Sequence, residues 1–281
     1  MKHPFSQVDV FARDGFAGNP VAVVHDAIGV GTSRMLEITS WTNLSEATFL
    51  LPPTGADADY RVRIFCPGRE LPFAGHPTLG SCAAWLAAGG TPRDPERIVQ
   101  ECGAGLVPIR RDGDRLAFAA PPMVRSGPID DELLEQRLDA LGLTRNNLLD
   151  AAWIDNGPGW MGLLLESADA VLDVTLPIGT HTGFDVGLIG LHPPGSECAL
   201  EIRGLFADAA GSVREDPVTG SLNASVAQWL IASGRISAPY VARQGTALGR
   251  SGRVFIDADG DDVWVGGECT VSISGSISIE S

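Results

Sequence analysis

Apolar and polar residues alternate along much of the chain, a pattern that is typical of half-buried β-strands. In the segment Tyr60 to Phe65, two arginines separate the apolar positions, so one face of this strand is expected to meet solvent. The C-terminal segment Val271 to Ile279 alternates valine or isoleucine with serine in the same way. Val107 to Arg111 and Leu116 to Ala119 are joined by Asp112-Gly113-Asp114, which predicts a hairpin.

Helix signals interrupt these strands. Asp130 or Asp131 is expected to cap a helix that carries leucines on one side and ends at Gly142. Thr32 or Ser33 is expected to cap an earlier, shorter helix. In the second half of the chain, further apolar segments predict strands over Trp160 to Leu165, Phe184 to Ile189 and Leu200 to Phe206.

Two helix starts in the chain share one pattern. The segments are His76-Pro77-Thr78-Leu79-Gly80-Ser81 and Asp216-Pro217-Val218-Thr219-Gly220-Ser221, and each leads into an apolar run that contains Trp-Leu. In both, an ionisable residue precedes proline, and Gly-Ser follows three residues after the proline. A near-repeat about 140 residues apart predicts two similar lobes, each with one apolar helix inside a strongly bent sheet.

The shared pattern suggests a way to hold an anion. Proline suits the first turn of a helix, and the first-turn N–H groups attract carboxylates. If the two starts face each other, they form a small cleft with His76 on one wall and Asp216 on the other. Each start alone is better explained as an ordinary capped helix with small residues for close packing, but the pair makes that explanation weaker.

Composition limits the classes of function. The chain has 281 residues, enough for one large domain or two of about 140. A net charge of -15 opposes binding to nucleic acid or to anionic membranes. Five cysteines without C-x-x-C spacing indicate neither a disulfide framework nor a zinc site. With no apolar signal segment and no membrane-spanning run, we expect a cytoplasmic protein.

One carboxylate stands at the mouth of an apolar strand. Glu46 ends the segment Asn43-Leu44-Ser45-Glu46 and precedes the apolar run Ala47 to Leu51. It can point to solvent from a half-buried strand. It can also be a desolvated acid with a raised pKa, which a proton shuttle requires. Spacing alone does not choose between these interpretations.

Taken together, several segments resemble the signature segments of the phenazine-biosynthesis PhzF-like family. The resemblance covers essentially the whole chain, in the family's order. The segments are Gly18 to Val23, Asn43 to Glu46, Leu71 to Gly80, Glu215 to Ser221, and Gln244-Gly245.

The resemblance implies a diaminopimelate-epimerase-like fold of the α+β class. Its two pseudo-symmetric lobes are each a barrel-like, mostly antiparallel sheet around a central helix, with the active site in the cleft between them. The lobes would be residues 1–122, completed by a returning final strand at 270–281, and residues 123–269. The family's habit also implies a homodimer.

The resemblance further implies roles for individual residues. Glu46 matches the general acid/base that moves a proton between carbons, and His76 and Asp216 match polar residues that orient the substrate and assist. Gly75, Gly220 and Ser221 match groups near the bound carboxylate and hydroxyl of the substrate. In the family's characterised member, the reaction is isomerisation of a dihydro-hydroxyanthranilic acid. This chain is therefore expected to isomerise a small carboxylate-bearing substrate with no cofactor and no metal.

Structural explanations of the same residues stay open. His76 can be a core histidine, and Asp216 and Ser221 can each cap the second helix. Gln244 and Arg250 can line the cleft, although turn chemistry explains both equally well. Pocket-shaping residues are also expected, without a rule that identifies the substrate, at Trp160, Met161, Phe184 and the loop from His181 to Gly187.

Two other functions compete with the isomerase. A two-base amino-acid racemase or epimerase of the same fold would use a pair of thiols at the helix starts. Here those positions hold His76 and Asp216, and the nearest thiol, Cys82, lies inside the predicted helix. A non-catalytic small-molecule-binding protein would not need the full set of polar residues.

Overall fold

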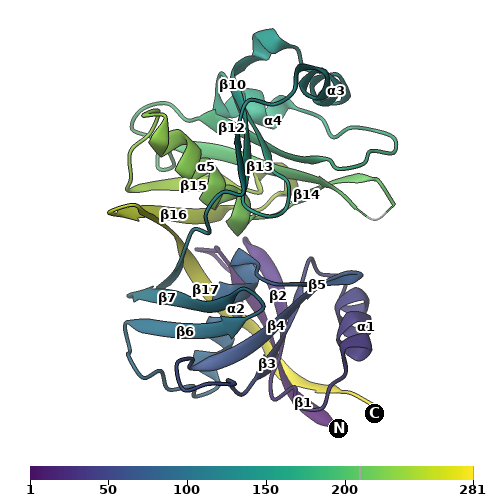
Figure 1. Ribbon diagram of the computed structural model, residues 1–281, viewed down its shortest axis with the longest axis vertical. Coiled ribbons are helices and arrows are strands. Elements are labelled where there is room, and N and C mark those ends of the chain that lie inside the picture. The colour runs from purple at the N-terminus through teal and green to yellow at the C-terminus, as the bar shows by residue number, and fades with distance from the viewer. Residues whose placement is uncertain (209, 281) are drawn as a thin grey trace. The chain divides into compact units, whose positions relative to one another are not determined.

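The chain forms two compact units in the computed structural model, which describes residues 1–208 and 210–280 (Figure 1). The first unit comprises Met1–Ala119 together with the C-terminal residues from Gly266 on, and the second comprises Ala120–Val265. None of the helices in the described residues is long and apolar enough to cross a membrane.

The first unit is a closed barrel. Its strands pair in the ring β17–β1–β2–β3–β4–β6–β7–β8, and β8 returns to β17. The pairs β2–β3 and β4–β6 are parallel, and the pairs β17–β1, β1–β2, β3–β4, β6–β7 and β7–β8 are antiparallel. The strands are β1 Lys2–Val10, β2 Asn19–Val24, β3 Ala47–Leu51, β4 Tyr60–Cys66, β6 Arg97–Cys102, β7 Gly105–Asp112, β8 Arg115–Ala119 and β17 Asp262–Ser278, with the short β5 Arg69–Leu71 beside β4.

One apolar helix fills this barrel. Helix α2, Gly75–Ala87, packs against β1, β2, β3, β6 and β8, and most of its residues are buried. A second helix, α1 (Thr32–Thr42), covers the opposite face of the sheet, where Met35 and Ile38 join the core formed with β2, β3 and Phe65. The sheet is therefore covered on both faces at β2 and β3, which explains why these strands are largely apolar.

The second unit repeats this plan with different connections. Its strands pair in the order β9–β10–β11–β12–β13–β15–β16, with β14 at β13 and with parallel pairs β11–β12 and β13–β15. The strands are β9 Arg125–Gly127, β10 Leu148–Asp155, β11 Met161–Leu165, β12 Asp185–Leu191, β13 Leu200–Ala207, β14 Val213–Asp216, β15 Tyr240–Gln244 and β16 Gly252–Asp259. Two 3-10 turns, η1 (Arg145–Asn147) and η2 (Thr246–Leu248), join these elements.

Helices cover both faces of this sheet as well. The apolar helix α5, Gly220–Ala232, packs against β10 and β16. On the other face, α3 (Asp131–Leu141) and α4 (Ala168–Asp173) share a core with β11, β12 and β13. The predicted α+β class, in which each lobe is a barrel-like, mostly antiparallel sheet around one helix, is confirmed.

Local predictions had mixed outcomes. Asp130 caps α3 by accepting hydrogen bonds from two backbone N–H groups, and left-handed Gly142 ends that helix, as expected. The cap predicted at Thr32 or Ser33 is wrong, because the N-cap of α1 is Gly31 and has no side-chain hydrogen bond. The alternating C-terminal segment belongs to a longer strand, since β17 continues without interruption from Asp262.

Close approach of α2 to the barrel wall predicts a stability effect at Gly80. A Cβ atom at Gly80 would lie 2.3 Å from Cγ1 of Val21 and 3.0 Å from Cγ2 of Val10. We expect Gly80→Ala to lower the free energy of unfolding by about 1–3 kcal/mol, as overpacked core substitutions do. Gly55→Ala is the control, because no atom lies within 4 Å of a Cβ there. Equal urea stability of the two variants would contradict this packing.

Candidate functional site

Glu46 lies where two parallel strands of the first unit begin. Helix α1 ends at Asn43 in the left-handed conformation, and the chain then turns into β3. The carbonyl of Glu46 accepts a hydrogen bond from the N–H of Ala22 in β2, at 3.5 Å. Its side chain is 17% exposed. The solvent-facing interpretation of Glu46 therefore does not hold.

His76 lies beside this carboxylate. It is the second residue of α2 and is buried, and its Nε2 lies 3.4 Å from Oε2 of Glu46. The other ring nitrogen, Nδ1, lies 3.4 Å from the side-chain nitrogen of Asn19. The Asn19 amide thus contacts Nδ1, and Nε2 faces the Glu46 carboxylate without a formed hydrogen bond between the two.

Burial determines the charge of His76. Desolvation lowers the pKa of this imidazole from 6.5 to about 3. The ring is therefore neutral at physiological pH. A neutral imidazole leaves the neighbouring carboxylate basic, whereas an imidazolium would stabilise the ionised carboxylate and weaken it as a base. The arrangement is compatible with proton abstraction by Glu46.

A buried aspartate supports Asn19 from behind. The carboxylate of Asp9 accepts hydrogen bonds from the backbone N–H groups of Ala17 and Gly18, each at 3.0 Å. A Cβ atom on Gly18 would lie 2.1 Å from the carbonyl oxygen of Val10, so no larger residue fits. This turn fixes the residue that starts β2, and hence the amide that orients His76.

Side-chain hydrogen bonds fix the rotation of α2 in the barrel. The hydroxyl of Ser81 donates to Thr48 in β3, and Thr48 donates to the carbonyl of Ala22 in β2. On another side, Gln100 of β6 donates to Thr78. Because α2 is held to β3 and β6 by these side chains, its first turn is kept from rotating away from Glu46.

The low pKa of His76 predicts a pH dependence of stability. Between pH 6.5 and about 3, the unfolded chain binds a proton at this residue and the folded chain does not. Stability should therefore fall as the pH is lowered, by about 1.4 kcal/mol per pH unit from this residue. Urea unfolding of His76→Gln should lack this contribution below pH 6.5. Parallel pH curves for variant and wild type would contradict it.

In the second unit, Asp216 is the last residue of β14. It pairs with Gly204 of β13, and its Oδ2 accepts a hydrogen bond of 2.6 Å from the hydroxyl of Thr219. Helix α5 begins only at Gly220. Pro217 is thus outside the helix, and the prediction that both prolines lie in a first turn holds for Pro77 and is wrong for Pro217. The side chain of Gln244 explains the difference, since it bonds the backbone of residues 216 and 219 before the helix begins.

Ser221 is the second residue of α5. Its Oγ accepts a hydrogen bond of 3.1 Å from the indole N–H of Trp160, and its carbonyl accepts one of 2.8 Å from Asn156. An indole N–H can only donate, so the hydroxyl proton of Ser221 remains available for another acceptor. Asn156 and Trp160 lie on the loop between β10 and β11, and of these two Trp160 was expected to shape the pocket.

Side-chain caps are missing from both helix starts. The N-cap residues are Ala74 in α2 and Thr219 in α5, and neither makes a side-chain cap hydrogen bond. The interpretation of Asp216 and Ser221 as caps is therefore wrong. Gly75 and Gly220 are the first residues of their helices, so their N–H groups belong to the positive ends.

Gln244 and Arg250 have structural roles. The side chain of Gln244 is fully buried, and it bonds to Thr219 and Asn223. The backbone N–H of Arg250 closes a turn onto the carbonyl of Gly245. Turn chemistry therefore accounts for the Arg250 backbone, while Gln244 belongs to the support of Asp216.

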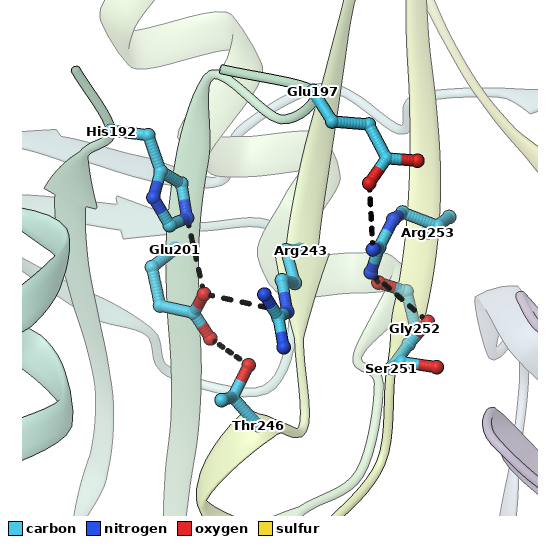
Figure 2. A network of polar contacts seen from close by, with 8 residues as sticks. All are labelled: His192, Glu197, Glu201, Arg243, Thr246, Ser251, Gly252 and Arg253. Atoms are coloured by element: carbon cyan, nitrogen blue, oxygen red, sulfur yellow. Dashed lines mark hydrogen bonds and ion pairs between the residues drawn. The ribbon is translucent and has the colours of Figure 1, made fainter.

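A polar network holds the end of β15 next to Gln244. Figure 2 shows the buried carboxylate of Glu201 between His192, Arg243 and Thr246. Thr246 donates to Oε1 of Glu201 at 2.6 Å, and Nε2 of His192 lies 3.2 Å from Oε2. Burial raises the pKa of Glu201. Its carboxylate links β13 to the turn that follows Gln244.

Thiol and metal chemistry find little support in the described residues. All five cysteines are free, and Cys82 is buried inside α2. Burial raises the pKa of the Cys82 thiol to about 12, so it is not a base at neutral pH. In the same part of the chain, no three His, Cys, Asp or Glu side chains gather in a way that could hold a metal ion.

Sequence reasoning missed the residues that support the site. Asn19, Asp9 and Thr219 each bond to a predicted site residue or to the loop before it. For Asn19, the available signal was its position in the Gly-Asn-Pro turn before an apolar strand. No pattern in the sequence connects Asp9 or Thr219 to its partner.

Comparison with known proteins gives a consistent picture. The model of a family described as phenazine biosynthesis-like protein matches residues 8–276. Trans-2,3-dihydro-3-hydroxyanthranilate isomerase of Pseudomonas aeruginosa is 33% identical over 92% of this chain and 91% of its own. Antisense-enhancing sequence 1 of Schizosaccharomyces pombe is 35% identical over 98% of each chain. A solved PhzF-family protein from Bacillus anthracis has a TM-score of 0.81 at 20% identity, covering 99% of this chain and 100% of its own.

Proposed function

The chain belongs to the phenazine biosynthesis-like protein family and is an isomerase, and we propose that Glu46 is its general acid/base. In this proposal the enzyme uses no cofactor. The Glu46 carboxylate removes a proton from one carbon of a small carboxylate-bearing substrate and returns it to another. The observation that carries the proposal is the contact between the shielded Glu46 carboxylate and a neutral, buried His76.

Each residue near Glu46 has a part in this reaction. Nε2 of His76 lies 3.4 Å from Oε2 of Glu46, and the other carboxylate oxygen is the one that abstracts the substrate proton. The neutral ring leaves Glu46 basic enough to abstract a proton from a carbon made acidic by neighbouring unsaturation. Asn19 contacts the other ring nitrogen at 3.4 Å and limits rotation of the ring.

In the same proposal, residues of the second unit have substrate-binding roles that come from the resemblance to the family. Asp216 assists proton movement as an acceptor of hydrogen bonds. Ser221 donates its hydroxyl proton to a substrate oxygen, because Trp160 already donates to its Oγ. The N–H groups of Gly75 and Gly220, at helix starts without side-chain caps, bind the substrate carboxylate.

For the substrate class, we propose an unsaturated cyclic carboxylic acid. Support comes from the relatives that are named trans-2,3-dihydro-3-hydroxyanthranilate isomerase. The thiol-dependent racemase is disfavoured, because Cys82 has a raised pKa and lies within a helix. By resemblance to the family, we also propose a cytoplasmic homodimer, which sedimentation at equilibrium would reveal as twice the mass of the chain.

A direct assay tests the proposal. Protein treated with a chelator and desalted is incubated with trans-2,3-dihydro-3-hydroxyanthranilate and with related unsaturated acids and amino acids, and products are followed by NMR. We expect an isomer of equal mass from an unsaturated acid, in the absence of any additive. A requirement for an added metal or coenzyme would refute the cofactor-free mechanism. Racemisation that survives Glu46→Gln and is lost in Cys82→Ser would establish the competing function.

A further inference from the structure

We propose that Gln244 and Thr219 are positioning residues that hold Asp216 as a hydrogen-bond acceptor in one orientation. Three side chains form a relay in which each hydrogen bond has a fixed direction, from Gln244 to Thr219 to Asp216. The inference rests on the proposed function, because it assigns a purpose to the orientation of Asp216.

The direction of the relay begins at the Gln244 amide. Its Oε1 accepts from the backbone N–H of Thr219 at 3.0 Å, and its Nε2 donates to the backbone carbonyl of Asp216 at 3.1 Å. A backbone N–H can only donate and a backbone carbonyl can only accept, so the amide has one possible orientation. Asn223 adds a second donor to Oε1 at 2.8 Å.

The fixed amide then determines the direction of the Thr219 hydroxyl. The remaining N–H of Gln244 donates to Oγ1 of Thr219 at 2.9 Å. Thr219 has a single hydroxyl proton, and Oδ2 of Asp216 lies 2.6 Å away to accept it. A carboxylate that receives such a bond is stabilised in its ionised form. The relay thus holds Oδ2 of Asp216 in place as a hydrogen-bond acceptor.

Helix capping does not account for the Thr219 hydroxyl. Thr219 is the N-cap of α5, where threonine usually bonds the backbone N–H two or three residues later. No such bond is present, and the hydroxyl is directed to Asp216. Removing the Thr219 hydroxyl therefore does not remove a helix cap.

Neighbouring strands leave room for the relay and keep it in place. A Cβ atom on Gly204 of β13 would lie 2.7 Å from Oγ1 of Thr219 and 3.3 Å from Nε2 of Gln244, so the strand must carry glycine there. On the other side of Gln244, Thr246 is tied to the buried Glu201 at 2.6 Å (Figure 2). The two ends of the relay, Asp216 and Gln244, are both paired with β13, at Gly204 and Ile202.

A matched pair of variants tests the relay. Thr219→Val replaces the hydroxyl by a methyl group of similar shape, and Thr219→Ser keeps the hydroxyl. With trans-2,3-dihydro-3-hydroxyanthranilate as the probe, Thr219→Val should lower kcat by up to about 10²-fold through misplacement of Asp216, with little change in KM. Thr219→Ser should keep at least about a third of kcat. Thermal unfolding should show both variants folded.

Other outcomes separate failure of the relay from failure of the proposed function. If Asp216→Asn loses activity while Thr219→Val keeps it, the relay is refuted and the proposed role of Asp216 stands. An equal loss in Thr219→Val and Thr219→Ser would mean that Thr219 acts through packing, which also refutes the relay. Full activity of Asp216→Asn would refute both.

Crystal structures of the two variants give a readout that needs no substrate. The relay predicts that the Asp216 carboxylate keeps its position in Thr219→Ser and adopts another rotamer in Thr219→Val. An unchanged carboxylate in Thr219→Val would overturn the inference even if the probe is not turned over.

Discussion

Glu46→Gln is expected to lower kcat by about 10²–10⁴-fold, the usual contribution of a positioned general acid/base. Glutamine has almost the same shape as glutamate, so it can occupy the same position beside His76. The variant should therefore fold and bind substrate normally but fail to remove a proton. Steady-state kinetics, with the unsaturated acid that the wild type isomerises as the substrate, measure the loss of kcat.

A second glutamate of the same unit serves as the control. Glu70 forms an exposed ion pair with Arg63 at 2.6 Å, so Glu70→Gln also removes one negative charge. That variant should keep wild-type kcat. If Glu46→Gln is as active as Glu70→Gln, Glu46 is not the acid/base.

Arg203→Met is expected to lower the free energy of unfolding by about 3–5 kcal/mol, because it leaves a buried charge without its partner. Arg203 and Glu215 lie 2.8 Å apart, and their side chains are 4% and 1% exposed. Arg203 also donates to the carbonyl of Val171, which ties β13 to α4. Glu215 directly precedes Asp216, so this ion pair anchors the strand that carries the proposed site residue.

Two comparisons separate this effect from a general loss of charge. Arg34→Met removes an exposed pair with Glu37 and should cost less than about 1 kcal/mol. The double variant Arg203→Met with Glu215→Leu removes both buried charges and should regain most of the stability. Urea unfolding measures all three. A loss below about 1 kcal/mol for Arg203→Met would show that the buried pair is dispensable.

Local chemistry made parts of this fold predictable. Aspartate before an amphipathic helix and glycine after it identified the ends of α3, at Asp130 and Gly142. Alternation over Tyr60 to Phe65 identified β4, whose arginines are half-buried between buried apolar residues. These signals act within a few residues, so the sequence alone carries them.

Contacts between distant segments set the limit of prediction. His76-Pro77 and Asp216-Pro217 have the same local pattern, yet only the first pair lies in its helix. The difference arises from Gln244, a residue from another strand that bonds the backbone at 216 and 219. A local sequence pattern carries no information about a hydrogen-bonding partner that lies on another strand.

The candidate site was likewise predictable only in part. The resemblance to a known family identified Glu46 and His76 as neighbours in function, and the structure brings them within 3.4 Å. Their supports, Asn19 in β2 and Asp9 in β1, were not predicted, because they act only through three-dimensional contact. That Asp216, Gly75, Gly220 and Ser221 act on the same substrate as Glu46 stays a prediction.

The most direct test follows a hydrogen isotope. A substrate that carries deuterium at the carbon that loses its hydrogen is converted in ordinary water under single-turnover conditions, and NMR locates the label in the product. If Glu46 carries the proton from one carbon to the other, wild-type product retains deuterium at the new carbon, and Glu46→Gln forms no such product. Product without deuterium, formed at the same rate by wild type and Glu46→Gln, would contradict the account.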